Sequence, residues 1–249
     1  MSNLDESDRN WLRKMLLTPI RRKGRKVLEI DDKDNVILSS GKRYKTRDPD
    51  MSDLAIEFYE TLYGKTMLES VESVDSKKHF CCDDFAGDTM NSYKSVANQF
   101  FGGNPKRCAK RKEAEKNGEV PPWLQEYFDG YHCLANFWAI PKAIGRAGGN
   151  KGDRYDFAFS YIEENLNNPD DPEFLDRHCV RCYTKIESDD SNTPECRLVV
   201  DKPDYDNPQE CVERVKELWK ARAEEIVNSS KAEQLLKCFK KLSSGGSTC

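Results

Sequence analysis

Apolar residues recur at helical spacing along most of the chain. Positions i, i+3, i+4 and i+7 that share an apolar stripe are typical of a helix with one face on a core. The pattern predicts helices over 4–17, 52–63, 85–101, 122–130, 153–166, 171–182, 208–226 and 230–242. Residues 106–120 are rich in Lys, Arg and Glu without an apolar period. They are predicted to form a solvated helix or a mobile loop.

Short apolar runs predict a few strands between these helices. Residues 27–30 and 36–38 flank a polar turn and predict a hairpin. Residues 131–141 are aromatic-rich and bounded by Gly130 and Pro141, which favours a buried strand. Another short strand is expected at 197–201. The predicted fold class is α+β, a helix-rich single domain over 1–242 whose small sheet combines the N-terminal hairpin with the buried central strand. A mobile tail, 243–249, is expected after it.

Composition places the chain among globular proteins and argues against a protein that coats DNA. Hydrophobic residues make up 37% and charged residues 34%, with a formal net charge of −4. A dedicated DNA-coating protein has a basic excess instead. A local basic patch stays open, because the run from Arg21 to Lys26 holds five basic residues in six. This run is either a solvated connector or a contact for phosphate or nucleic acid.

The chain is expected to be cytoplasmic, without a membrane span and with reduced thiols. No run approaches the ~18 apolar residues that a spanning helix needs, and the first residues are acidic and polar, unlike a secretory signal. Ten cysteines in a chain of this length without such a signal predict free thiols rather than disulfides.

One cysteine pair has the spacing of a metal or redox motif. Cys179 and Cys182 follow His178 as a C-x-x-C, which supplies two or three of the four ligands of structural zinc. However, Leu175, His178, Cys179 and Cys182 also share a helical stripe, which favours packing in the core. The sequence therefore predicts no metal and no cofactor here, with zinc and redox chemistry as the alternatives.

A glycine-rich loop connects the predicted central strand to the next helix. Backbone N–H groups in such a loop attract phosphate, and Arg146, Lys151 and Arg154 add positive charge. The Walker A pattern does not fit, because Asn150 replaces its second glycine and Gly152 its hydroxyl residue. The segment Gly145 to Gly152 is predicted to bind an anion, and a flexible surface loop is the alternative.

Polar residues gather at two predicted helix starts and on the central strand. Short carboxylates at such starts are usually N-caps, but next to buried segments they are also typical of a ligand site. We expect one contact network from Asp88, Asn91, His132, Asn136, Arg154 and Asp156. Catalytic roles would fall to Asp88, His132 and Asp156, and ligand-binding roles to Thr89, Asn91, Ser92, Asn136, Arg146, Lys151 and Arg154.

Several short segments together resemble a bacterial protein family of unknown function. They are Asp48-Pro49-Asp50, Gly87 to Ser92, Tyr131 to Phe137 with Pro141, and Asp153 to Asp156. The resemblance covers roughly residues 45–170 and implies a bacterial, intracellular, one-domain protein, without supplying a reaction.

The expected function is that of an intracellular bacterial accessory or ligand-binding protein, of the kind found in defence or mobile-element systems. Its predicted partners are another protein and a nucleotide or nucleic acid, bound through Arg21 to Lys26 and the Gly145 to Gly152 loop. The alternative is a metal-dependent phosphodiesterase or nuclease that uses Asp88, Asp156 and His132. The sequence leaves open whether the protein is an enzyme.

Overall fold

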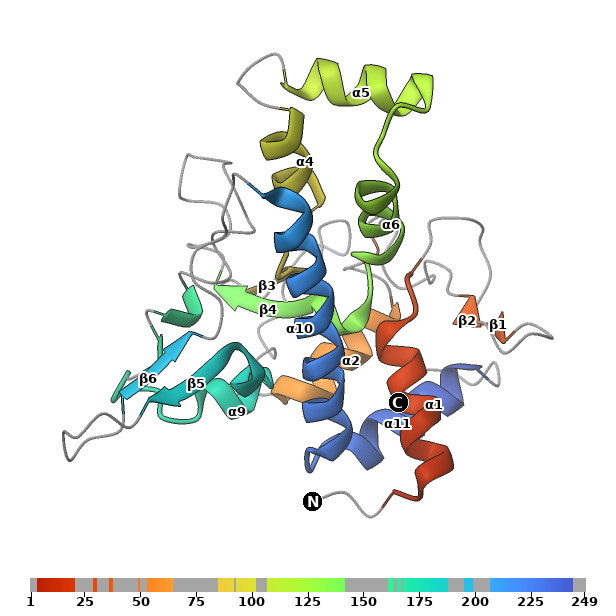
Figure 1. Cartoon of the computed structure of the whole chain (residues 1–249). Helices are drawn as coiled ribbons and strands as arrows, with labels where there is room; N and C mark the ends of the chain where they lie inside the picture. The colour runs from red at the N-terminus through yellow and green to blue at the C-terminus, as the bar shows by residue number, and fades with distance from the viewer. Residues whose placement is uncertain are drawn as a thin grey trace. The chain divides into compact units, whose positions relative to one another are not determined.

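Figure 1 shows a computed structural model of the chain, in which helices predominate. The described residues are 4–20, 29–30, 36–37, 49, 53–64, 85–91, 93–101, 107–141, 161–163, 165–166, 168–187, 195–198 and 207–243. The helix-rich character predicted from the sequence is confirmed. Among these residues, none of the helices is long and apolar enough to cross a membrane.

The chain divides into two compact units, each built from separated segments. Unit 1 comprises Met1–Thr89, His132–Gly149 and Ala223–Cys249, and unit 2 comprises Met90–Tyr131 and Asn150–Arg222. One long helix, α10 (Pro208–Asn228), contributes residues to both. Because both units interleave in the sequence, compactness alone does not make them separate domains, and the single domain expected over 1–242 stays a prediction.

Three helices supply most of the core of unit 1: α1 (Glu6–Leu17), α2 (Asp53–Tyr63) and α11 (Ala232–Ser243). Helix α2 is buried on nearly all sides, and α11 packs against both α2 and α1. Helix α2 is followed by Gly64, whose φ of +80° is the left-handed conformation common just past a helix end. The amphipathic patterns that predicted these three helices are confirmed.

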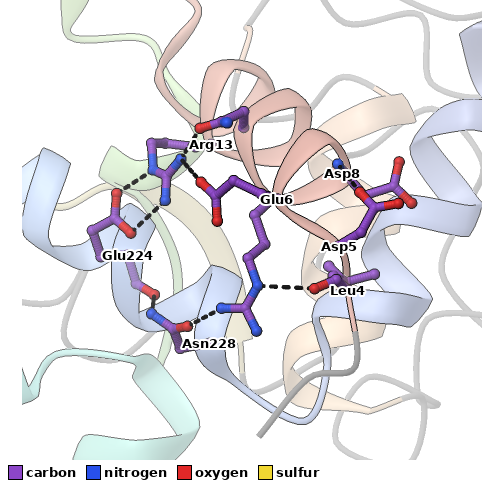
Figure 2. Close-up of polar contacts among 9 residues, drawn as sticks. Leu4, Asp5, Glu6, Asp8, Arg13, Glu224 and Asn228 are labelled. Carbon is purple, nitrogen blue, oxygen red and sulfur yellow. Dashed lines mark hydrogen bonds and ion pairs between the residues drawn. The ribbon is translucent and has the colours of Figure 1, made fainter.

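Polar contacts hold α1 against the C-terminal end of α10 (Figure 2). The Asp5 carboxylate caps α1 by accepting from the Asp8 N–H at 2.8 Å. The Arg13 guanidinium donates to both carboxylate oxygens of Glu224, and this hydrogen bond raises the pKa of Arg13. Asn228, one turn further along α10, accepts from Arg9 at 2.6 Å. These contacts fix the rotation of α1 about its axis, while burial of its apolar face supplies the stabilisation.

The strands described in unit 1 form two antiparallel pairs. The predicted hairpin is present as β1 (Glu29–Ile30) and β2 (Val36–Ile37), with Glu29 opposite Ile37. The second pair is β3 (Phe85–Thr89) and β4 (Phe137–Pro141), which α2 covers. Within the described residues, therefore, the hairpin and the central strand lie in separate pairs, whereas the sequence predicted that they share one sheet.

The segment 85–92 was predicted to open a helix, and the structure corrects this. Phe85–Thr89 is strand β3, in register with β4 from Phe85 opposite Pro141 to Thr89 opposite Phe137. Helix α4 (Tyr93–Phe101) begins only afterwards. The pairing partner lies some fifty residues away in sequence, so the local apolar spacing, which continues from Met90 into α4, masked the strand.

The predicted central strand is shorter than expected at its start. Residues 131–133 form a bend, and a 3-10 turn, η3 (Leu134–Asn136), precedes β4. His132 and Asn136 therefore lie before the strand instead of on it. The β4 side chains of Phe137 and Trp138 are buried, as predicted for the aromatic run.

Unit 2 contains three helices next to one another in Figure 1: α4, α5 (Arg107–Asn117) and α6 (Pro122–Gly130). Both α5 and α6 contact α4. Helix α6 packs on the middle of α10, where the rings of Tyr127 and Trp219 stack at 5.3 Å. The charged segment predicted as either a helix or a loop is thus a helix.

The rest of unit 2 differs from the prediction in where its elements end. Helix α9 (Phe174–His178) stops before the predicted end at Cys182, because Cys179 adopts a left-handed φ of +51°. A 3-10 turn, η4 (Arg181–Tyr183), leads into β5 (Thr184–Glu187), which pairs with β6 (Glu195–Leu198). The sequence had predicted a strand at 197–201, whereas β6 begins at Glu195. Of the predicted tail, Ser243 still belongs to α11, and 244–249 lie outside the described residues.

Candidate functional site

The β3–β4 pair brings together some of the residues predicted to form a site in unit 1. Asp88 lies opposite Trp138 in the ladder, and Thr89 lies opposite Phe137. Asn136 immediately precedes Phe137, so these three positions share one end of the pair. Thr89 and Asn136 are buried. Asp88 therefore lies on a strand. It does not cap a helix, which was the structural role predicted for its carboxylate.

His132 lies at the bend that precedes η3. Its backbone carbonyl accepts from the Ile20 N–H at 2.7 Å, and its ring packs against the edge of Phe137 at 6.3 Å. These contacts tie the bend to the residues after α1 and hold the imidazole on an apolar ring.

Asn91 belongs to unit 2, where its side chain is completely buried. The Tyr183 hydroxyl donates to its amide oxygen at 3.4 Å. This long hydrogen bond links Asn91, two residues before α4, to η4.

The remaining predicted site residues lie outside the described part of the chain. They are Ser92, Arg146, Lys151, Arg154 and Asp156, together with Arg21 to Lys26 and the Gly145 to Gly152 loop. The predicted six-residue network and the catalytic roles of Asp88, His132 and Asp156 therefore stay predictions.

The C-x-x-C segment is packed mainly by apolar burial. His178 and Cys179 are buried, whereas Cys182 is partly exposed. Burial first, and then the charges of Arg222 and Arg177, lower the pKa of His178 to about 3. Arg222 is itself fully buried and donates from Nε to the His178 carbonyl at 3.0 Å. The imidazole is thus neutral at physiological pH, and the described residues contain no group of three metal-ligating side chains.

Two surface hollows lie among the described residues of unit 1. One, of about 450 Å³, lies between α1 and α11, and the ion pair of Asp8 and Lys240 lies on its wall. The other, of about 180 Å³, lies between α2 and α11 and is lined by the buried Glu57 and by Cys238. The residues predicted from the sequence line neither hollow. Both hollows have walls of mixed charge, which select no single ligand.

Helix α5 of unit 2 combines positive charge with exposure. Its eleven residues include five basic and two acidic side chains, a local charge of +3 in a chain of net −4. Lys110, Lys112 and Lys116 are exposed, and among the side chains described on α5 only Ala114 is buried. Among its described side chains, three lysines and two glutamates are therefore exposed.

Tyr93 of α4 makes polar contacts with α5. The Tyr93 hydroxyl donates to Glu115 at 3.0 Å, and the Arg111 guanidinium lies 5.9 Å from the centre of the Tyr93 ring. Burial, and next the hydrogen bond to Glu115, raise the pKa of Tyr93, so it stays a protonated donor. Arg111 also pairs with Glu115 at 3.4 Å. These contacts engage Arg111 and Glu115 with α4, and the three lysines lie on the exposed surface.

Aromatic side chains lie on the two helices that flank α5 in sequence. Phe100, at the end of α4, is 39% exposed and meets Trp123 of α6 edge to face at 5.3 Å. Phe128 of α6 is 44% exposed and packs against the edge of Tyr93 at 4.6 Å. Phe100 lies on the apolar stripe that predicted its helix, and Phe128 on a helix predicted from its aromatic residues, so the sequence pattern did not indicate that either ring is exposed. Their exposure could have been inferred from their position in sequence, close to residues 106–120, which have no apolar period.

Comparisons with protein-family models, with curated proteins and with solved structures find no match to this chain. The resemblance to a bacterial family of unknown function therefore stays a prediction.

Proposed function

We propose that this protein is an accessory protein that binds nucleic acid, with α5 as the element that contacts phosphates. The observation that carries the proposal is the three exposed lysines, Lys110, Lys112 and Lys116, on a helix with a local charge of +3 in a chain whose net charge is −4. Lysines that neutralise phosphates release condensed counterions, and this release drives binding without regard to base sequence.

The packing of α5 supports this function over a merely solvated helix. A surface helix is normally stabilised by burial of an apolar face, and the described side chains of α5 offer Ala114 for that purpose. Tyr93, Arg111 and Glu115 hold the helix in place by polar contacts instead. Selection for stability alone would favour a more apolar sequence here, so the lysine-rich surface is best explained by a negatively charged partner.

The basic run from Arg21 to Lys26 and the Gly145 to Gly152 loop lie outside the described residues. In this proposal they remain predicted as further phosphate contacts, because both carry the same sign of charge as α5. Bacterial origin and a place in a defence or mobile-element system belong to the proposal as its expected setting.

Binding to a fluorescein-labelled oligonucleotide, followed by anisotropy over a series of salt concentrations, tests the function. Each phosphate contact contributes about 0.7 to 0.9 to the slope of log affinity against log salt concentration. The triple variant Lys110→Glu/Lys112→Glu/Lys116→Glu is expected to reduce that slope by about 2 and to weaken binding at low salt at least tenfold.

A matched control separates a site from an effect of net charge. Lys220→Glu/Lys231→Glu/Lys237→Glu changes the charge by the same amount at three exposed positions outside α5. It is expected to weaken binding much less than the α5 variant. Equal losses in the two triple variants, or wild-type protein that binds no oligonucleotide, would contradict the proposal.

A further inference from the structure

We infer that the nucleic acid is single-stranded, and that Phe100 and Trp123 form the surface on which one of its bases stacks. This inference rests on the proposed function, and it names the class of nucleic acid that the α5 surface takes.

The first argument is the exposure of an ordered aromatic pair. Phe100 packs edge to face on Phe101 at 4.9 Å and on Trp123 at 5.3 Å, so both neighbours fix its ring. It nevertheless keeps 39% of its surface in water. A fixed, half-exposed ring offers an apolar surface at little cost in side-chain entropy, which suits stacking on a flat partner.

The second argument is the position of the pair relative to the lysines. Phe100 and Trp123 lie at the two helix ends that connect to α5, on α4 and α6. Each is six or seven residues from the nearer end of α5 in sequence, a span of at most about 25 Å of chain. Figure 1 shows α5 lying across the ends of α4 and α6, and α4 contacts both of the other helices. Cations that contact the backbone and rings that stack with bases are the two parts of a single-strand site.

The charges around the second exposed ring exclude it from the same role. Phe128 lies between Glu126 and Asp129, both exposed on α6. Glu126 is offset in part by an ion pair with Lys216 at 2.6 Å, but Asp129 adds negative charge beside the ring. A phosphate backbone is repelled there, so Phe128 provides an internal control of equal size and similar exposure.

Stacking also decides between single strands and duplexes. In a duplex the base faces are covered by neighbouring bases, whereas an unpaired strand can turn a base onto an aromatic side chain. The lysines alone would bind both forms. A preference for the single strand should therefore depend on Phe100 and Trp123, and overall affinity should depend on the α5 lysines.

The test compares a labelled single strand with the duplex of the same sequence, for wild type, Phe100→Ala, Phe100→Tyr and Phe128→Ala. Wild type is expected to prefer the single strand about tenfold. Phe100→Ala is expected to lose most of that preference, Phe100→Tyr to keep it, and Phe128→Ala to leave it within about twofold. Quenching of tryptophan fluorescence by the single strand should fall in Trp123→Phe, and circular dichroism of each variant establishes that it is folded.

Different failures point to different steps. If the α5 lysine variant loses binding while wild type binds both forms equally, the stacking inference is wrong and the proposed function stands. If Phe128→Ala has the larger effect, the site is not at Phe100. If no nucleic acid binds and an apolar, acidic protein segment does, the surface serves a protein partner, and both proposals fail.

Discussion

Helices α11 and α5 have nearly the same length and a similar share of lysine, but they differ in how many of their described side chains are buried. In α11, of twelve residues, five side chains are buried: Ala232, Leu235, Leu236, Cys238 and Phe239. In α5, of eleven residues, the described side chains include one buried residue, Ala114. Lys237 and Lys240 lie on the exposed face of a helix that is required for the core of unit 1. The lysines of α5 belong to a helix on which Ala114 alone is buried among the described side chains.

The comparison shows that exposed lysines on a helix do not by themselves indicate a ligand site. It must also be known whether the opposite face of the helix is buried. Where that face is buried, hydrophobic burial explains the helix, and its lysines need no further role. Where it is not, the charged surface itself needs an explanation. The predictions below test this difference, beginning with the largest effect.

Leu235→Ala in α11 is expected to reduce the free energy of unfolding by about 3 kcal/mol, because it leaves a cavity at a fully buried position. Urea unfolding followed by circular dichroism measures the change. Lys237→Ala, on the exposed face of the same helix, should change stability by less than about 0.5 kcal/mol. Similar effects at both positions would remove the distinction between the two faces of α11.

The pH dependence of the free energy of unfolding should show that His178 is buried in unit 2. Its pKa of about 3 in the folded protein lies below the ordinary value of 6.5. As the pH falls, the unfolded chain therefore takes up a proton at His178 before the folded protein does. The contribution of the neutral imidazole to the free energy of unfolding is fully present above about pH 6.5 and declines as the pH falls toward 3. The loss is at most about 1.4 kcal/mol per pH unit, or about 2 kcal/mol at pH 5.

Urea unfolding at several pH values, for wild type and His178→Gln, isolates this effect. Carboxylates titrate in both proteins, so the difference between the two curves belongs to the imidazole. Parallel curves between pH 7 and pH 5 would mean that His178 is accessible to solvent and does not lie in a core.

The ion pair of Arg13 with Glu224 should orient α1 more than it stabilises it. The two side chains are 29% and 45% exposed, so water and salt screen their attraction. A double-mutant cycle with Arg13→Gln and Glu224→Gln is expected to give a coupling energy below about 1 kcal/mol, and less at high salt. A coupling of several kcal/mol would show that α1 depends on this pair as much as α11 depends on its apolar face.

The smallest effect is expected in α5 itself. Lys110→Ala/Lys112→Ala/Lys116→Ala should change the free energy of unfolding by less than about 0.5 kcal/mol, since the three side chains are exposed and alanine favours helix. The same variant should bind oligonucleotide more weakly. A large loss of stability would make the lysines structural and would weaken the case for a ligand.

The sequence alone determined the elements whose pattern of apolar and polar residues is complete within one stretch of the chain. Helices α1, α2, α10 and α11 follow from apolar residues at helical spacing, and the hairpin of β1 and β2 from two short runs around a polar turn. Charge and composition likewise pointed to a surface rich in both signs. These features are local, so a single stretch of sequence carries the whole signal.

Only the tertiary structure decided where distant segments meet and which apolar residues stay in water. Strand β3 exists because β4 supplies its hydrogen bonds, and nothing within residues 85–92 records that partner. Helix α9 ends at His178 because Cys179 takes a left-handed conformation, although the apolar stripe continues to Cys182. Phe100 and Phe128 occupy apolar positions of their helices, yet their exposure depends on how α4, α5 and α6 pack. Periodicity gives the face of a helix on which a residue lies, whereas burial requires a second surface to cover that face.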